Sequence, residues 1–480
     1  MDTAANGRAT RLMSLLNRPV ILLAAGLGLS AAAGSGFLAV VNHSLDPALV
    51  VPLPGLYFLL SAIGTGMFAA FEQEMTRAVS RALALGHDES QVIRHQVRNA
   101  AWVGVGTIAA VCAASPYMTR HWMHGNWVVF AELVLGLVSI WAAFLVRGVL
   151  SGRQQFRSYA ITMVVEGLAR LVPSILLAVS GYGSTWAYGL VFALGSAAAA
   201  VSGLFVARAP IPVAAPEGAA ASGEPETANQ AAARLARLTG GVLAGQVLMY
   251  AVPLVVTSRL TAPKDAALAV AVSSAIGLTR MALLILFPLQ APLLPKLTAA
   301  AAHGRMDAVR RTTAALVAVC VGAGLAAIAG TGLFGPWVLR TIMGTRADLS
   351  AGFLMELATG TLFLLVANVL QSALTALNRQ QTVLVAWSLG VVTMIAVFAV
   401  PLGPLTTAAV ASMIGPVVTA ALMTADVLRV TRQPVQEAGS QGSEPKESGS
   451  QGSGPQELGP DGKLPARPQD RSVRRIVGSR

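Results

Sequence analysis

The sequence predicts an all-α integral membrane protein, with about twelve transmembrane helices in two six-helix lobes related by a parallel repeat around a central cavity. Hydrophobic residues make up 54% of the 480 residues and charged residues only 12%, whereas a soluble domain carries about 25% charged residues. Charged residues are nearly absent from stretches of 20 or more residues and crowd into the segments between them. A hydrocarbon core about 30 Å thick requires this distribution of spanning helices.

Apolar segments bounded by charges or turn residues predict the individual spans. These segments are 19–42, 49–71, 100–119, 127–150, 160–181, 185–207, 238–258, 267–291, 312–334, 351–377, 382–402 and 404–428. An Ala, Pro, Gly and Glu-rich stretch indicates a cytoplasmic linker between the two lobes. The expected organisation is a cytoplasmic N-terminus at 1–18, an N-lobe at 19–207, the linker at 208–236, a C-lobe at 237–430 and a disordered cytoplasmic tail at 431–480.

The basic residues of the loops predict the orientation in the membrane. With the N-terminus inside, 27 of the 34 Lys and Arg residues fall on the cytoplasmic side and five outside, or 18 against five without the long tail. Cytoplasmic loops carry such an excess of basic residues. We therefore expect a multi-pass protein of the cytoplasmic membrane with both termini inside.

Short sequence matches between the halves indicate an internal duplication. GRQQ (152–155) follows the fourth predicted helix, and NRQQ (378–381) follows the tenth. Glu132 and Glu356 stand near the starts of the same two helices. Because six is an even number, both copies enter the membrane in the same direction, which predicts a parallel repeat about an axis along the membrane normal.

Several function classes have no support in the sequence. It contains no phosphate-binding GxxxxGK[ST] loop, no GxSxG elbow and no HExxH helix. The close pair His121 and His124 lacks a third ligand at metal spacing, so no metal site is expected. The net charge of +12 is explained by the cytoplasmic loops and is no sign of nucleic-acid binding. We expect a protein that is not an enzyme and needs no cofactor.

Charges inside the predicted spans are the candidate substrate-binding residues. An arginine at the bilayer centre costs about 2.5–3.5 kcal/mol on insertion scales and usually faces the bundle interior. Arg170 lies one turn after Glu166, and these two residues either neutralise each other or contribute to a site. Arg280 has no acid at i±3 or i±4. Its charge must be answered by another helix, by water or by an anionic ligand, which favours a place in the central cavity.

Glu132 and Glu356 are the candidate ion-coupling acids, because each lies at the edge of an apolar span. A buried carboxyl group can exchange a proton during transport. Acids so close to the outer interface can equally reach water, and both interpretations stay open at this point.

Three segments resemble a known family of exporters. They are RGVLSGRQQFRSYAITMVVEGLAR (147–170), FPLQAPLLPKLTAAAAHGRMDAVRR (287–311) and ALTALNRQQTVLVAWSLG (373–390). They look like the polysaccharide-transporter branch of the multidrug/oligosaccharidyl-lipid/polysaccharide exporter superfamily, over residues 19–428. The multidrug branch usually carries acids in helices 1 and 7, which are absent here. The lipid II flippases typically have fourteen helices.

The resemblance implies a flippase for lipid-linked oligosaccharides. Its substrate would be a polyprenyl-diphosphate-linked oligosaccharide, moved from the inner to the outer leaflet by alternating access for cell-surface polysaccharide biosynthesis. Arginine suits a diphosphate because its planar fork of donors can pair bidentately with phosphate oxygens. Expected partners are this substrate, membrane lipids and a cell-envelope glycosyltransferase or polymerase. The alternatives are an exporter of small amphiphiles or drugs, and a non-transporting scaffold of a cell-envelope assembly complex.

The predicted topology can be tested by labelling a single cysteine introduced at Ala220, with Cys112 and Cys320 replaced. An impermeant maleimide should leave this site unlabelled in intact cells and label it after permeabilisation, because the linker is expected inside. A cysteine at Asp46, in an expected outer loop, provides the positive control. Labelling at position 220 in intact cells would reject the assignment.

Overall fold

A computed structural model describes residues 19–207, 228–260, 262–285, 297, 305–377 and 379–432. Helices account for the regular structure of these residues, and no strand occurs among them. Eleven described helices are long and apolar enough to cross a membrane, or twelve if one bent pair counts as a single span. The predicted fold class is confirmed. The N-terminus 1–18, most of the linker and the tail beyond residue 432 lie outside the described residues.

The first half forms six spans with few breaks. Its elements are α2 (Pro19–Ser44), α3 (Pro47–Val50), α4 (Pro52–Leu59), η1 (Leu60–Thr65), α5 (Gly66–Ala84), α6 (Glu89–Ala113), α7 (Ser115–Trp122), α8 (Trp127–Gly152), α9 (Phe156–Val179) and α10 (Thr185–Val206). The second span runs well past its expected end at residue 71, through the whole of α5. Its centre, η1, is a π-helical segment. Such segments occur mostly as short interruptions of α-helices, frequently at functional sites.

The third span bends sharply where α6 meets α7. The two helices are inclined by 63°, and Pro116 stands in the first turn of α7. Proline cannot donate the backbone hydrogen bond that would continue α6, so the chain turns at Ala114. α6 also begins at Glu89, earlier than the predicted residue 100, with the Asp88 side chain accepting from the Ser90 N–H as an N-cap.

The second half repeats this order of elements. They are α11 (Ala228–Arg259), η2 (Pro263–Asp265), α12 (Ala266–Arg280), η3 (Met281–Ile285), α14 (Met306–Trp337), η4 (Val338–Ile342), α15 (Ala351–Ala376), α16 (Gln380–Ala399) and α17 (Pro404–Arg432). α11 starts within the stretch 208–236 that was expected to be linker. Its first turns, ANQAAARLARL, consist mainly of strong helix formers.

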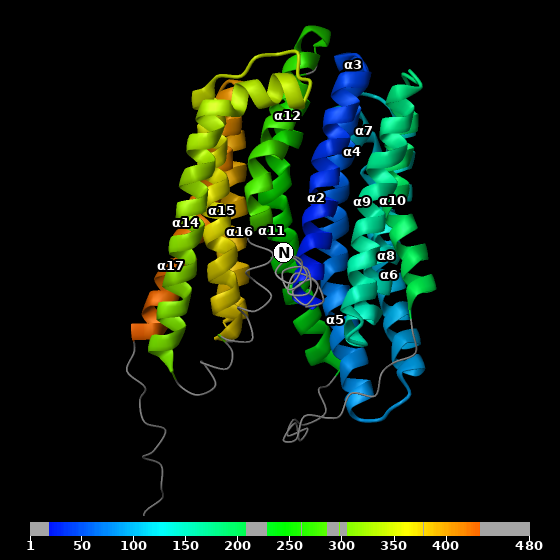
Figure 1. Ribbon diagram of the computed structural model, residues 1–480. Helices are drawn as coiled ribbons and strands as arrows, with labels where there is room; N and C mark the ends of the chain where they lie inside the picture. Colours follow the sequence, from blue (N-terminus) through cyan, green and yellow to red (C-terminus); the bar gives the residue numbers. More distant parts are fainter. Residues whose placement is uncertain are drawn as a thin grey trace, which may run out of the picture. The chain divides into compact units, whose positions relative to one another are not determined.

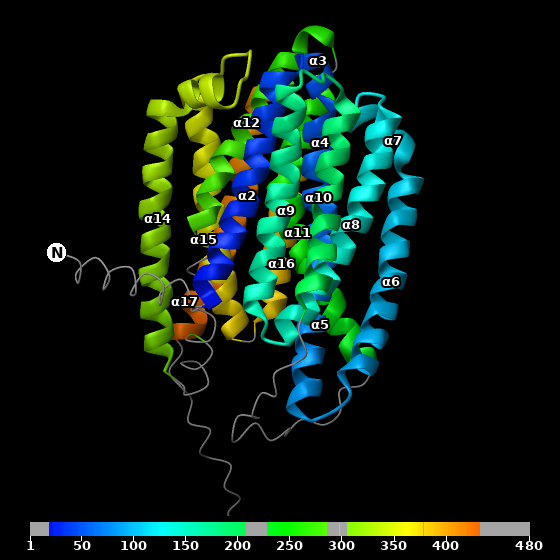
Figure 2. The ribbon, with the colours of Figure 1, turned by 45° about the vertical axis from the view of Figure 1, so that its right-hand side comes forward.

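The packing of the helices recurs in the two halves. In the first half, α2 packs along α9, and both α8 and α9 pack on α10. In the second half, α11 packs along α16, and both α15 and α16 pack on α17. Figure 1 shows α14 and α15 on one side, α6 to α10 on the other, and α2, α11 and α12 between them, and Figure 2 shows α14 and α6 at opposite edges. This recurrence agrees with the predicted parallel repeat, while a superposition of the halves stays a prediction.

The GRQQ and NRQQ matches contain Arg153 and Arg379, which the predicted repeat makes equivalent, and both lie in turns after the fourth and tenth spans. Arg153 follows α8 and pairs with Glu89 at 2.7 Å, and Arg379 precedes α16 and pairs with Asp426 at 2.7 Å. Both arginines therefore stand in the same turn of their halves. Each turn is tied by an ion pair to another helix of its own half.

The halves contact each other by polar groups at the end of α2. The Asn42 amide donates to the Ser274 hydroxyl at 2.9 Å and to the Met343 carbonyl at 2.8 Å. Beyond the helix end, Arg346 and Asp46 form an exposed ion pair at 2.9 Å. In the expected topology this is the outer end of the molecule, so these contacts close the space between the halves on that side.

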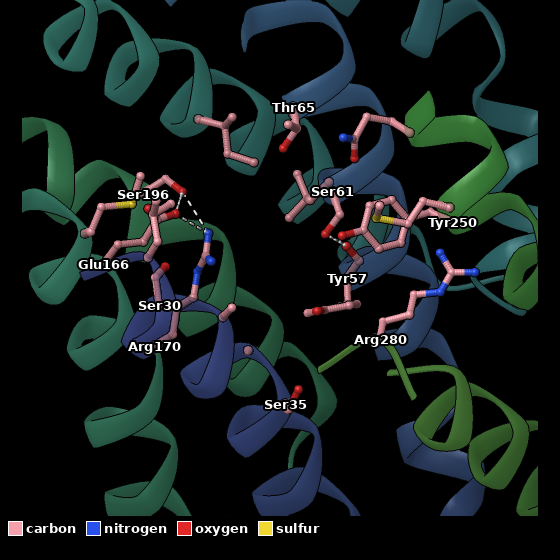
Figure 3. Close-up of a pocket in the computed structure, with 18 of the residues that line it drawn as sticks. Ser30, Ser35, Tyr57, Ser61, Thr65, Glu166, Arg170, Ser196, Tyr250 and Arg280 are labelled. Carbon is pink, nitrogen blue, oxygen red and sulfur yellow. Dashed lines mark hydrogen bonds and ion pairs between the residues drawn. The ribbon is translucent and has the colours of Figure 1, made fainter. Parts of the chain in front are cut away.

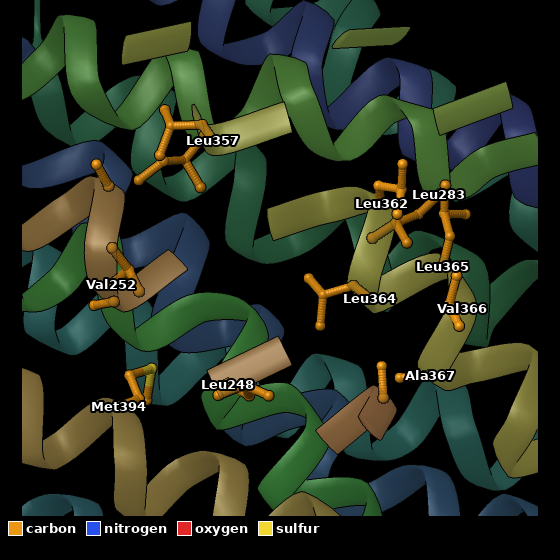
Figure 4. Packing of buried hydrophobic residues seen from close by; sticks show 14 of the residues in the cluster. Leu248, Val252, Leu283, Leu357, Leu362, Leu364, Leu365, Val366, Ala367 and Met394 are labelled. Carbon is orange, nitrogen blue, oxygen red and sulfur yellow. The ribbon is translucent and has the colours of Figure 1, made fainter. Parts of the chain in front are cut away.

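Apolar packing otherwise lies largely within each half. One cluster joins helices of the second half, including Leu248 and Val252 of α11, Leu357 of α15 and Met394 of α16 (Figure 4). Another consists mainly of first-half residues, with Phe37, Leu56 and Leu133 fully buried. The second cluster also includes Leu254 of α11 and Val270 of α12, so apolar packing joins the halves as well.

Close contact of α15 with α17 depends on Gly360. A Cβ at this position would lie 2.1 Å from the Ser412 carbonyl oxygen. Gly360→Ala should therefore force the helices apart and lower stability by about 1–3 kcal/mol. The measurement is the melting temperature in detergent by fluorescence-detected size-exclusion chromatography. Gly352→Ala on the same helix is the control, because no atom lies within 4 Å of its Cβ position. Equal melting of both variants would contradict the described packing.

Candidate functional site

A cavity of about 450 Å³ lies between the two halves, within the size range of small-molecule sites. Residues of α2, α4, η1, α8, α9 and α10 line it from the first half, and residues of α11, α12, η3 and α15 from the second. Its charged lining residues are Arg147, Glu166, Arg170 and Arg280. Three positive charges against one negative charge make the described lining net positive.

Glu166 joins two arginines in one wall of the cavity. Its Oε2 accepts from Arg147 Nη2 at 2.5 Å, and its Oε1 lies 2.7 Å from Arg170 Nη2. Ser196 of α10 donates to the same Oε1 and accepts from Arg170 at 2.8 Å (Figure 3). Thr162 accepts from Arg147 Nε at 3.1 Å. The network ties α8, α9 and α10 together and answers a charge that lipid could not solvate.

A small residue makes room for Arg170. A Cβ at Gly195 of α10 would lie 2.4 Å from Arg170 Cγ, so the arginine stem lies directly against the α10 backbone. The guanidinium also lies over the Phe192 ring, 4.5 Å from its centroid. This position lets a long charged side chain cross a helix interface and reach the cavity.

Arg280, the last residue of α12, lies in the opposite wall. It makes no hydrogen bond or ion pair with the described residues, and its Nε and Nη1 atoms are buried without a partner. Its guanidinium lies 5.9 Å from the centroid of the Tyr250 ring. A cation–π contact supplies only part of what a desolvated guanidinium loses. Arg280 therefore retains unsatisfied donors beside the cavity.

Aromatic rings line the cavity between these two positive groups. Tyr57 lies between the Arg170 group and the Tyr250–Arg280 group in Figure 3. Its ring centroid is 5.5 Å from that of Phe192 and 5.0 Å from that of Phe58. The η1 segment adds two hydroxyl groups, Ser61 and Thr65, to the lining.

The candidate ion-coupling acids lie apart from the cavity lining. Glu132 is 5% exposed in α8, and its Oε2 has no hydrogen-bonding partner among the described residues. It lies against Gly189 of α10, where a Cβ would meet it at 1.9 Å. Glu356 is exposed on the surface of α15. The two acids thus have different surroundings, although they occupy similar places in the sequence.

The 27 Lys and Arg residues expected on the cytoplasmic side include Arg147, and this expectation for Arg147 is wrong. In the structure it is 4% exposed within α8. Its position just before the end of the apolar run 127–150 did not distinguish a buried arginine from one reaching the head groups. The acid that answers it, Glu166, lies on the next helix, and this pairing depends on tertiary packing. The sequence also did not identify Tyr57 and Tyr250 as site residues, because an aromatic residue in an apolar span does not by itself indicate a site.

No protein-family model matches the chain. An uncharacterized protein of Mycobacterium tuberculosis is 26% identical over 372 residues, which cover 76% of this chain and 82% of that protein. Another uncharacterized protein of the same organism is 24% identical over 368 residues, which cover 76% of this chain and 81% of that protein.

Solved structures with a similar fold are membrane transporters. A multidrug resistance MATE family transporter of the MOP superfamily, in its inward-facing conformation, has a TM-score of 0.67 at 14% identity, over 84% of this chain and 95% of that one. An outward-facing structure with the same family description has a TM-score of 0.61 at 15% identity, over 86% of this chain and 95% of that one. A MOP superfamily transporter from Pyrococcus furiosus has a TM-score of 0.61 at 14% identity, over 86% of this chain and 96% of that one.

These likenesses establish the fold, while the superfamily suggested by the sequence stays a prediction. At such low identity they do not extend to substrate or residue roles, and the polysaccharide-transporter branch stays a prediction. The chain has the architecture of multi-pass membrane transporters.

The shared carboxylate predicts a strong effect of Glu166→Gln. This change removes the carboxylate that pairs with both buried arginines, Arg147 and Arg170, and breaking a buried pair costs about 3–5 kcal/mol. We expect a markedly lower melting temperature in detergent and less inserted protein. Asp348→Asn provides the control, because it removes an equally short but exposed pair with Arg340, worth about 0–1 kcal/mol. A Glu166→Gln variant as stable as this control would show that the network does not hold α8 to α9.

Proposed function

We propose that the protein is a flippase that moves a polyprenyl-diphosphate-linked oligosaccharide from the inner to the outer leaflet by alternating access. The observation that carries this proposal is Arg280, a guanidinium with buried, unpartnered donors in a cavity between two transporter halves. A diphosphate supplies the acceptors that Arg280 lacks, in the planar geometry that arginine binds best.

The size of the cavity suits the headgroup of such a lipid. About 450 Å³ accommodates a diphosphate with its first sugars, and a long polyprenyl chain would remain in the surrounding lipid. The hydroxyls of Ser61 and Thr65 and the amides of Gln246 and Asn368 offer hydrogen bonds to a sugar. The cycle would bring this polar lining to each leaflet in turn. A cell-envelope glycosyltransferase or polymerase would supply or consume the substrate.

Export of small amphiphiles or drugs is the second candidate, because the similar solved structures include multidrug transporters. The net positive lining favours anionic over cationic compounds in this cavity. A cavity between the halves that contains charged and hydroxyl side chains also fits a transporter better than a non-transporting scaffold, for which a packed apolar centre is expected.

The role of Arg280 is tested by Arg280→Ala and Arg280→Lys. Alanine should abolish flipping at normal protein level, and lysine should restore only part of it, because lysine keeps the charge but loses the bidentate fork. The measurement is the accumulation of lipid-linked oligosaccharide in the inner leaflet, normalised to inserted protein. Arg340→Ala is the matched control, since this arginine is exposed and outside the cavity lining.

Two results would contradict the proposal. Full activity per molecule in Arg280→Ala would remove Arg280 from the substrate site. If Arg280→Ala loses export of an anionic dye or drug while the level of inner-leaflet lipid-linked oligosaccharide stays unchanged, the drug-exporter candidate would be favoured.

A further inference from the structure

The aromatic lining connects the two arginine groups in an unbroken series of rings. Phe192, beneath Arg170, contacts Tyr57, and Tyr57 in turn contacts Phe58. The centroid of the Phe58 ring lies 6.0 Å from that of the Tyr250 ring, and the Arg280 guanidinium lies over the Tyr250 ring. All four rings belong to the cavity lining. A ligand lying along this aromatic strip (Phe192, Tyr57, Phe58 and Tyr250) would meet a guanidinium at either end.

Arg170 keeps donors for such a ligand although it is paired. Its Nη2 contacts Glu166 and Ser196, and its Nε donates to the Phe192 carbonyl at 3.4 Å. Its Nη1 makes no hydrogen bond with the described residues. Glu166 is also shared with Arg147, so one carboxylate answers two cations.

The acidic residue behind this wall of the cavity, Glu72, does not contact Arg170. Glu72 of α5 accepts a hydrogen bond from the Tyr159 hydroxyl at 2.7 Å, on the Arg147 side of the network, and it is not part of the lining. The Arg170 end of the strip therefore presents positive charge to the cavity.

We propose that the cavity binds two anionic groups of one substrate, with the diphosphate at Arg280 and an acidic group of the saccharide at Arg170. This inference rests on the proposed function and narrows its substrate class to acidic glycans, in which a sugar near the diphosphate carries a carboxylate or phosphate. The sugar rings between the two groups would lie along the aromatic strip. Arg170 is then a specificity-determining residue, and Glu166 positions it.

Binding of matched synthetic lipids to the full chain in nanodiscs tests this inference. The acidic probe is farnesyl diphosphate linked to N-acetylglucosamine and glucuronic acid. The second probe is its glucuronate methyl ester, which keeps the diphosphate but has no charge on the saccharide. A third probe carries glucose 6-phosphate in place of glucuronate. Wild-type protein should bind both acidic probes about tenfold more tightly than the ester, as measured by isothermal titration calorimetry.

Two variants separate the ends of the site. Arg170→Gln should abolish the tenfold preference for the acidic probes over the ester. Arg280→Gln should weaken the binding of all three probes by a similar factor. If only one acidic probe is preferred, the result identifies whether carboxylate or phosphate is the second group.

The failures are distinguishable. Equal binding of acid and ester by wild-type protein would overturn the two-ended site, even if Arg170→Gln failed to fold. Equal weakening of acid and ester by Arg170→Gln would also overturn it, since Arg170 would then act on the whole ligand. No binding of any probe, or no effect of Arg280→Gln, would instead overturn the proposed function.

Discussion

A charge inside the hydrocarbon must be answered by another group of the protein or its ligand, and this constraint organises the centre of the molecule. Lipid offers neither hydrogen bonds nor counter-ions, so an arginine there faces the interior. Glu166 answers Arg147 and Arg170 within the first half. Nothing in the described part of the chain answers Arg280. The same physical rule thus gives Arg147 and Arg170 a counter-ion within the protein and leaves Arg280 available for a ligand.

Close helix packing makes these positions attainable. Gly195 admits the Arg170 stem against α10, and Gly148 and Gly152 bring α8 close to α5. The Thr76 and Ser80 hydroxyls then reach the carbonyls of these two glycines. In a membrane, where no hydrophobic effect drives helices together, small residues and hydrogen bonds of this kind provide the association. The charged wall of the cavity depends on them, because its residues come from three different helices.

The sequence predicted the architecture because apolar length and loop charge are local properties of each segment. It also singled out Arg280 and the Glu166–Arg170 pair, since an uncompensated charge stands out in an apolar run. It misassigned Arg147, whose partner lies on another helix. It predicted the second and third spans imperfectly, because the helices continue beyond the membrane-length apolar runs. The cavity itself, with Tyr57 facing Phe192, arises only from packing between segments distant in the chain.

The proposed alternating access would require the halves to separate where they now meet without losing their own cores. The contacts at the end of α2 suit this requirement. Asn42 bridges to Ser274 and Met343 by hydrogen bonds, and the Asp46–Arg346 pair is exposed. Exposed pairs contribute about 0–1 kcal/mol, and amide hydrogen bonds can be exchanged for water. Apolar burial also crosses between the halves, because Leu254 of α11 and Val270 of α12 belong to the same cluster as Phe37 of α2. Opening must therefore expose apolar surface in addition to exchanging these polar contacts for water. The Glu166 network lies within the first half and need not be broken.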